Sequence, residues 1–394
     1  MSMKPVKKVV SNYRIVNRQG YFFGFHDKTP FSFDNALLLA HKYNSEDNVK
    51  PKPWEQVELG YFSGHDYLEF RAITKTHAWN WTQGAMLQWV GGEKNFIYND
   101  FNGREHVATM MDISGNIIKQ LPLPVGAVSG NGRRAISYNF ARLRKGMPGY
   151  GYANVVDPDL AINIPDSEDS SLKLIDIHRE SISTLFSVAD IAAVEPDQSM
   201  ENAFHYFTHC LFNPSGNRFV FFHRWLINNN RRYTRMISSD LNCNEIYIFP
   251  TSGMVSHIAW KDDRHILAYA RTKEYNDKYY LFKDQSDDFE IVGEKHFTSD
   301  GHPQFSPDGR YILTDTYPDR FRRQHLILYD YHNDKRVNVA SLQLPIKFMR
   351  EARCDFHPRW NRDGTMICFD SAHTGKRSLC TIDLKENTTK DQIN

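Results

Sequence analysis

Apolar residues in this chain fall into short, strand-length runs separated by polar turns, and one unit of this kind returns seven times. The unit is an apolar strand, a turn of the Asp-Gly type and a second apolar strand, as in PQFSPDGRYILTDTY from Pro303. The other copies begin at Pro30, Met86, Ala127, Cys210, His257 and Pro358. Most of their turns recur at intervals of roughly 40 to 60 residues, a period typical of β-propeller blades.

Further apolar strand pairs lie between the copies of this unit, for example at residues 107–123 and 172–188. Two hairpins per repeat make a four-stranded antiparallel blade. The pattern therefore predicts an all-β fold, a seven-bladed β-propeller that occupies residues 1–394 as a single domain. We expect the final strand, SLCTIDL, to pair with an N-terminal strand near Tyr13–Val16 and so to close the ring.

One interval between turns is much longer than the others and predicts an insertion near residues 144–205. Inside it, SVADIAAVEP at 187–196 is the one segment with a helical pattern. A β-sandwich or a pair of separate domains is the alternative architecture. Either of these would leave the seven copies of the unit as a coincidence.

The charge balance excludes one class of function. Lys plus Arg number 48 and Asp plus Glu number 47, so the formal net charge is +1. No basic field is available to neutralise phosphates, and we expect no nucleic-acid partner. The chain has no apolar run of membrane-spanning length, and its N-terminus lacks the apolar core of a signal peptide. With five cysteines, an odd number that argues against a disulfide framework, these features favour a cytoplasmic protein with no membrane span.

Histidines, aromatic residues and arginines gather where blades begin and end, beyond what turns require. The chain has 17 histidines, and many lie at equivalent positions of the blades. Because function in such folds lies in the loops, we predict a binding mouth at one face of the propeller. The residues predicted to bind a substrate there are His26, Trp79, Asn80, Arg142, Arg144 and His223. The alternative is structural, since a histidine repeated between blades often hydrogen-bonds the neighbouring blade.

A candidate metal site joins the starts of the last two blades. Cys354 and His357 form a C-x-x-H pair. His302 precedes the first strand of the neighbouring blade, and Asp300 lies two residues before it. Histidine, cysteine and carboxylate are ligands of zinc and manganese. We predict a divalent metal here, with zinc favoured, and a closed set that includes cysteine would make it structural.

The same residue types suit β-elimination of a 4-linked uronate. That reaction needs a cation to neutralise the carboxylate, a base to remove the C5 proton and an acid to protonate the leaving oxygen. The candidates are His77, His209 and His223 as bases or acids, Tyr150 as their partner, and Arg142, Arg144 and Arg224 as clamps. Arginine suits the clamp because its planar guanidinium binds a carboxylate through two hydrogen bonds.

The extended motifs around these residues resemble known families. The FSPDGRYIL type of repeat is similar to the propellers of the TolB kind and of oligogalacturonate lyase. Longer segments resemble the seven-bladed ulvan lyases over residues 21–373, among them YFFGFHDKTPF, AWNWTQGAMLQW, NFARLRKGMPGYGY and CDFHPRWNRDGTMICFDSAH. The resemblance implies a polysaccharide lyase with an anionic oligosaccharide or polysaccharide as its partner.

The resemblance also implies roles for individual residues. Motif position places the elimination on His77, His209, Tyr150 and Arg224. A mainly structural zinc, as in ulvan lyases, would map to His302, Cys354 and His357, with Asp300 beside them. Oligogalacturonate lyase instead uses a catalytic metal held by several histidines and a glutamine, so a cysteine ligand departs from that pattern.

A second departure leaves other functions open. Where the lyase pattern would carry another catalytic histidine after AWNWTQG, this chain has Tyr98, Asn99 and Asp100. One alternative is a glycosyl-transferring enzyme of surface-polysaccharide biosynthesis on the same propeller. Another is a propeller that binds sugar or protein without catalysis. Neither the glycan nor the oligomeric state follows from the sequence.

Overall fold

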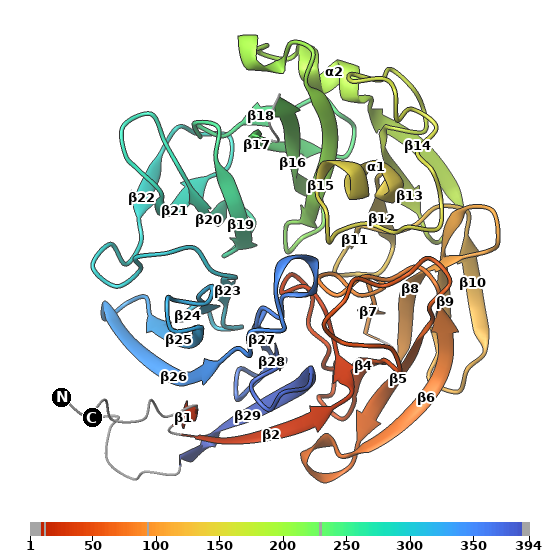
Figure 1. The fold of residues 1–394 in the computed structure, drawn as a ribbon. Coiled ribbons are helices and arrows are strands. Elements are labelled where there is room, and N and C mark those ends of the chain that lie inside the picture. The colour runs from red at the N-terminus through yellow and green to blue at the C-terminus, as the bar shows by residue number, and fades with distance from the viewer. Residues whose placement is uncertain (1–8, 12, 93, 228–230, 388–394) are drawn as a thin grey trace.

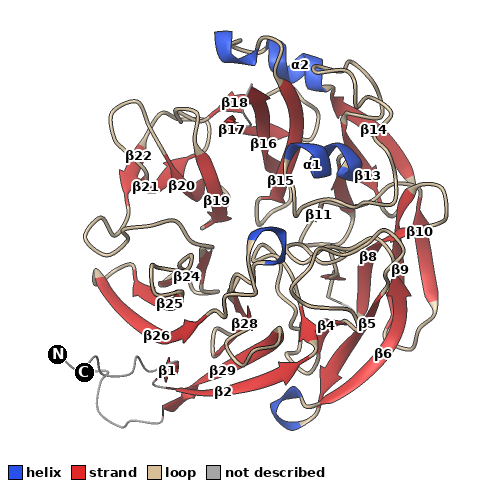
Figure 2. Cartoon of the chain, in the orientation of Figure 1, coloured by secondary structure: helices blue, strands red, loops and turns tan. Residues whose placement is uncertain are grey.

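The described part of the chain forms seven antiparallel sheets arranged as blades in a ring. A computed structural model describes residues 9–11, 13–92, 94–227 and 231–387. Figure 1 shows the blades following one another around the ring in chain order, and Figure 2 shows that strands dominate with few helices between them. The predicted seven-bladed β-propeller is confirmed. Among the described residues, no helix is long and apolar enough to cross a membrane.

Each blade begins with its innermost strand and proceeds outward. Blade one consists of β3 (Tyr21–Phe22), β4 (Leu38–Lys42), β5 (Val57–Ser63) and β6 (Glu69–Thr76). Blade two consists of β7 (Gln88–Val90), β8 (Asn95–Phe101), β9 (His106–Asp112) and β10 (Ile117–Leu121). Blade three consists of β11 (Ala127–Val128), β12 (Arg134–Ser137), β13 (Leu172–Asp176) and β14 (Ser181–Phe186). Blades four and five consist of β15 (Phe204–Phe212), β16 (Arg218–Ile227), β17 (Arg231–Asp240) and β18 (Tyr247–Ile248); and β19 (Val255–Trp260), β20 (His265–Ala270), β21 (Lys278–Lys283) and β22 (Phe289–Ile291).

The last two blades take strands from the N-terminus. Blade six is β23 (Gln304–Phe305), β24 (Tyr311–Asp315), β25 (Arg323–Asp330) and β26 (Lys335–Gln343), extended by β1 (Val9–Ser11); blade seven is β27 (Arg359–Trp360), β28 (Met366–Ser371), β29 (Ser378–Asn387) and β2 (Tyr13–Gln19). Ile15 lies opposite Ile382, so the predicted pairing of the two chain ends is confirmed. Closing a ring in this way protects sheet edges that would otherwise be exposed.

The predicted insertion at 144–205 is not one excursion. It contains β13 and β14, which are the outer strands of blade three, with a loop before them and a helical segment after them. The expected helix is α2 (Val188–Ala193), which begins at a capping box between Ser187 and Asp190. A second helix, α1 (Phe140–Gly146), was not predicted; the Asn139 side chain caps it by accepting from the backbone N–H of Arg142.

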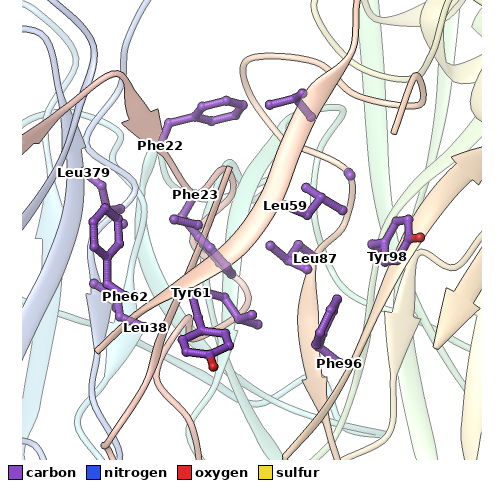
Figure 3. Close-up of a cluster of buried hydrophobic side chains, with 14 of the residues drawn as sticks. Phe22, Phe23, Leu38, Leu59, Tyr61, Phe62, Leu87, Phe96, Tyr98 and Leu379 are labelled. Atoms are coloured by element: carbon purple, nitrogen blue, oxygen red, sulfur yellow. The ribbon is translucent and has the colours of Figure 1, made fainter. Parts of the chain in front are cut away.

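Apolar side chains pack between neighbouring blades. The cluster in Figure 3 joins blade one to both of its neighbours, with Phe22, Leu38 and Leu59 from blade one, Phe96 from blade two and Leu379 from blade seven. These five side chains are fully buried. Burying an apolar side chain of this size contributes about 1.5–3 kcal/mol to folding stability. The blades therefore stabilise one another and keep their innermost strands in fixed positions.

Arg142 ties the loop after α1 to blade four and does not face a binding mouth. Its side chain is 2% exposed and pairs with Asp157 at 3.1 Å. The guanidinium also donates to the carbonyl oxygens of His205, Asp159, Ile162 and Asn163. The prediction that Arg142 binds substrate is therefore wrong, because all three nitrogens of its guanidinium already donate to protein acceptors.

We expect Arg142→Leu to lower the free energy of unfolding by about 3–5 kcal/mol, because it leaves the buried Asp157 carboxylate without its partner. Denaturant titration measures this loss. Arg144→Gln is the matched control, since Arg144 lies exposed on the same helix and its replacement should change stability by less than about 0.5 kcal/mol. Equal losses in the two variants would contradict the anchoring role.

His223 belongs to a buried hydrogen-bonded chain, which corrects its prediction as a substrate-binding residue. Arg235 Nε donates to Nδ1 of His223 at 3.0 Å. The other ring nitrogen of His223 therefore carries the proton and donates to Nδ1 of His205 at 2.8 Å. His205 donates in turn to the carbonyl of Met200 at 2.9 Å. Both histidines are fully buried and hold the segment after α2 against blade four.

This chain of groups predicts a loss of stability in acid. Burial, helped by Arg142 and Arg235, lowers the pKa of His205 from 6.5 to about 4, and burial with Arg235 lowers the pKa of His223 well below its usual range. As the pH falls below 6.5, these histidines bind protons in the unfolded chain but stay neutral in the folded chain. The free energy of unfolding therefore falls until about pH 4, by about 3 kcal/mol for His205 alone.

Chemical denaturation of wild type and His223→Gln across this pH range tests the prediction. Glutamine can accept from Arg235 and donate to His205, as the neutral imidazole does. We expect the variant to lose less stability on acidification. Identical pH dependence in the two proteins would show that the histidine chain does not carry the effect.

Candidate functional site

A cavity of about 630 Å³ opens where the innermost strands begin. Its walls come from blades four to six, from the loop after α1 and from the loop that leads into blade seven. The polar residues that line it include Tyr150, His209, Arg224, His257, Arg353 and Asp355. Gly149 and Glu351 both line this cavity, and a side-chain carbon on Gly149 would contact Glu351, so the two loops meet beside it.

A repeated pattern places histidines at this end of the ring. The segments HCLF, HIAW, HPQF and HPRW begin at His209, His257, His302 and His357 and end on an aromatic residue of the innermost strand or beside it. The strand register shifts near His209 in β15 and near His257 in β19. His209 and His357 have φ angles of 55° and 45°. Such bulges and left-handed residues turn a side chain out of the regular strand alternation.

Phe25 lies at the centre of this group of rings. Its ring centroid is 5.1 Å from that of His357, 5.2 Å from that of His209 and 6.0 Å from those of His257 and His302. Phe25 is 5% exposed. It therefore fixes the separation of histidines that come from four different blades.

Three of the buried groups can hold a metal ion. Ligand atoms of His302, Asp355 and His357 all lie within 4.8 Å of one another. His302 Nδ1 contacts Asp315 at 2.7 Å, which leaves its Nε2 for a metal. His357 Nε2 is buried with no hydrogen-bond partner in the described structure. Arg353 binds Asp355 at 2.7 and 2.8 Å and holds its carboxylate in place. An orphaned imidazole nitrogen beside a carboxylate suits a divalent cation.

Two residues of the predicted metal set do not belong to it. Cys354 packs in an apolar cluster with Leu344, Phe348 and Ala372, and burial raises the pKa of its thiol to about 12, which disfavours the thiolate that metals bind. Asp355, one residue further along, instead has a carboxylate oxygen within 4.8 Å of the ligand atoms of His302 and His357. Asp300 instead contacts His257 Nδ1 at 3.0 Å and accepts from the Ser256 hydroxyl.

His209 lines the large cavity and has one buried ring nitrogen without a partner. Its Nδ1 contacts the Thr208 hydroxyl at 2.9 Å, and its Nε2 has no partner among the described residues. Burial, with Arg224 nearby, lowers the pKa of His209 well below its usual range, so the imidazole is neutral. Tyr150 lies 5.9 Å away between ring centroids. Burial raises the pKa of Tyr150, so its hydroxyl stays protonated.

Arg224 is a buried cation without an acidic partner. It is 3% exposed, and none of the described acids forms an ion pair with it. Its guanidinium contacts the Met147 sulfur at 2.9 Å and the Val255 carbonyl at 3.3 Å and lies 5.0 Å from the centroid of the Phe222 ring, and its Nε has no hydrogen-bond partner in the described structure. Burial lowers its pKa to about 10. An uncompensated guanidinium on a cavity wall is suited to an anionic ligand.

The structure brings together three of the four predicted catalytic residues and places the fourth elsewhere. His209, Tyr150 and Arg224 line the cavity. His77 lies outside it, with Nε2 at 2.8 Å from the Gln56 amide nitrogen. The prediction that all four share one cavity is therefore wrong for His77, because its strand end faces the neighbouring loop of blade one.

The remaining predicted binding residues lie beside or beyond this cavity. Trp79, Asn80 and Arg144 line a small crevice that shares Tyr150 with it. Trp79 donates to the Glu55 carbonyl and Asn80 to the Gly151 carbonyl, so these two support loops. His26 lines a different cavity at the other end of the innermost strands. Sequence reasoning missed Asp355 and His257, although the repeated histidine pattern contained the signal for His257.

Comparison with known proteins supports the fold and not a family. No protein-family model and no curated protein matches the chain. An oligogalacturonate lyase in complex with manganese aligns with a TM-score of 0.64 and 12% identity, covering 96% of this chain and 97% of its own. The oligogalacturonate lyase of Vibrio parahaemolyticus aligns with a TM-score of 0.61 and 11% identity, covering 95% and 93%.

Other propellers align less closely. TolB from Acinetobacter baumannii has a TM-score of 0.44 at 12% identity and covers 78% of this chain and 63% of its own. The GH74 xyloglucanase of Xanthomonas campestris has a TM-score of 0.51 at 12% identity and covers 95% and 54%. The resemblance to ulvan lyases stays a prediction. At these identities the likeness establishes the β-propeller fold and no activity.

Proposed function

We propose that this protein is a lyase that cleaves a uronate-containing oligosaccharide by β-elimination, with a divalent metal in its site. The observation that carries the proposal is the buried, acid-free guanidinium of Arg224 beside a neutral histidine and a set of metal-ligand groups. Oligogalacturonate lyases on the same fold support this choice of chemistry.

Arg224 is the clamp for the substrate carboxylate in this proposal. Two parallel hydrogen bonds from the Arg224 guanidinium to the substrate carboxylate would supply the anionic partner that it lacks among the described residues. Neutralising the carboxylate makes the adjacent C5 proton more acidic. Arg353 is less suited to the role, because its guanidinium already donates two hydrogen bonds to the Asp355 carboxylate.

His209 is the base and Tyr150 the acid. The free Nε2 of His209 accepts the C5 proton, and the electron pair left on C5 forms the C4–C5 double bond as the C4–O bond breaks. The protonated Tyr150 hydroxyl supplies the proton to the leaving oxygen. The step is redox-neutral, and proton exchange between the two residues through solvent restores them.

His302, Asp355 and His357 would hold the metal. A divalent ion there supplies positive charge that stabilises the enolate-like transition state. The predicted zinc rested on Cys354, and a set of two histidines and a carboxylate suits manganese as well as zinc. The neighbour solved with manganese favours a divalent ion of that kind.

Incubation with a panel of uronate oligosaccharides, with and without manganese, tests the proposal. The unsaturated product absorbs in the ultraviolet, so turnover appears as a rise in absorbance. Arg224→Gln should abolish the rise, whereas Arg310→Gln, which removes an exposed arginine paired with Asp330, should not. Substrate consumption without an unsaturated product, or full activity of Arg224→Gln, would overturn the proposal.

A further inference from the structure

A second cavity, of about 420 Å³, lies at the opposite end of the innermost strands. Strand β19 contributes Val255 and His257 to the first cavity and Ile258 and Trp260 to the second. The layer between the two contains Phe25, whose ring touches His26 of the second cavity as well as His209 and His257 of the first. The size is within the range of about 300–1,000 Å³ that small-molecule pockets have.

Four large aromatic residues line this second cavity. They are Phe212, Trp260, Phe305 and Trp360, one from each innermost strand of blades four to seven. Each is the last residue of the same four-residue pattern that begins with a histidine. One repeat therefore supplies histidines to the first cavity or the layer beside it and aromatic rings to the second.

Three buried polar atoms around the second cavity have no hydrogen-bond partner in the described part of the chain. They are the indole Nε1 of Trp260, the indole Nε1 of Trp360 and Oδ1 of Asp27. Trp360 is 4% exposed and the Asp27 side chain 8%, while the other Asp27 oxygen pairs with Lys28 at 2.6 Å. Buried indole N–H groups normally find an acceptor. The residues that line the cavity therefore carry two donors and one acceptor that the described protein leaves unused.

We infer that this second cavity binds a single sugar ring. Pyranose C–H faces pack on aromatic rings, and sugar hydroxyls both accept and donate hydrogen bonds, which matches the indole N–H groups and the Asp27 carboxylate. Arg362 also lines the cavity; its Nε donates to the Phe31 carbonyl at 3.2 Å, and its remaining nitrogens provide a contact for a carboxylate if the sugar is a uronate. The inference does not depend on lyase activity.

Fluorine NMR of fluorotryptophan-labelled protein locates such a ligand. The chain has 7 tryptophans, and Trp260→Phe and Trp360→Phe assign the two relevant signals. Titration with glucose, galactose, glucuronate and galacturonate should shift these two signals saturably. With the neutral sugars, the signals of Trp79 and Trp81, which lie beside the first cavity, should stay in place and serve as the internal control.

Loss of one indole N–H should weaken binding about tenfold, so Trp260→Phe should raise the Kd read from the Trp360 signal by that factor. Unchanged signals from the other tryptophans report that the variant is folded. If the protein prefers the uronates and Arg362→Gln removes that preference, the ligand is an acidic sugar. If all four sugars bind equally, the cavity binds the sugar ring without a contact to its carboxylate. Shifts confined to Trp79 and Trp81, or no saturable shift with any of the sugars, would overturn the inference.

Discussion

Replacing His209 by alanine is expected to lower turnover by about 10²–10⁴-fold, the usual effect of losing a positioned acid or base, while the melting temperature changes little. The free Nε2 of His209 makes no hydrogen bond to any described residue, so its removal breaks no bond there. The ring borders a cavity of about 630 Å³, and solvent can replace it. Kinetics on a confirmed uronate substrate, with a thermal melt of the same sample, measures both quantities.

His205 provides the matched control, because it lies in the same strand β15. Both of its ring nitrogens are hydrogen-bonded and it is fully buried. His205→Ala should therefore lower the melting temperature strongly. If His209→Ala instead unfolds the protein, or keeps full activity, His209 is structural and the base must be another residue.

The contrast between these histidines marks where prediction from sequence ends. His205, His209 and His223 have the same residue type and similar apolar neighbours. The register shift near His209 turns that one ring toward the axis, whereas His223 stays in regular pairing with Arg235. A bulge of this kind depends on the strand that pairs with it, so the local sequence did not reveal which histidine faces the cavity.

The blades could be predicted because their signal is local and repeated. Alternating apolar strands and Asp-Gly turns specify hairpins, and the apolar strand at Tyr13–Gln19 had a free partner in the last blade. Helix α1 was missed because Phe140–Gly146 is short and its cap at Asn139 acts through one backbone contact. Arg142 and Arg224 look alike in sequence, and only the tertiary structure shows that one has acceptors for its guanidinium and the other lacks an acid.

Removal of the metal ligands is expected to have the second large effect. Asp355→Ala and His357→Ala should each weaken manganese or zinc binding by more than the 10–100-fold that is typical of losing an outer-shell partner, because each removes one of three groups within 4.8 Å. Elemental analysis after dialysis and a metal titration measure the loss. Under the proposed function, turnover should fall with metal content, and added manganese should restore a chelator-treated wild type.

Cys354→Ala separates this site from the one that the sequence alone predicted. The Cys354 side chain packs with Leu344 and Phe348 and carries a thiol whose pKa burial raises to about 12. Its replacement by alanine should therefore keep the metal content of the wild type, at a small cost in packing. Metal lost from Cys354→Ala and retained in Asp355→Ala would return the site to His302, Cys354 and His357. The opposite result would show that Asp355, and not Cys354, completes the site with His302 and His357.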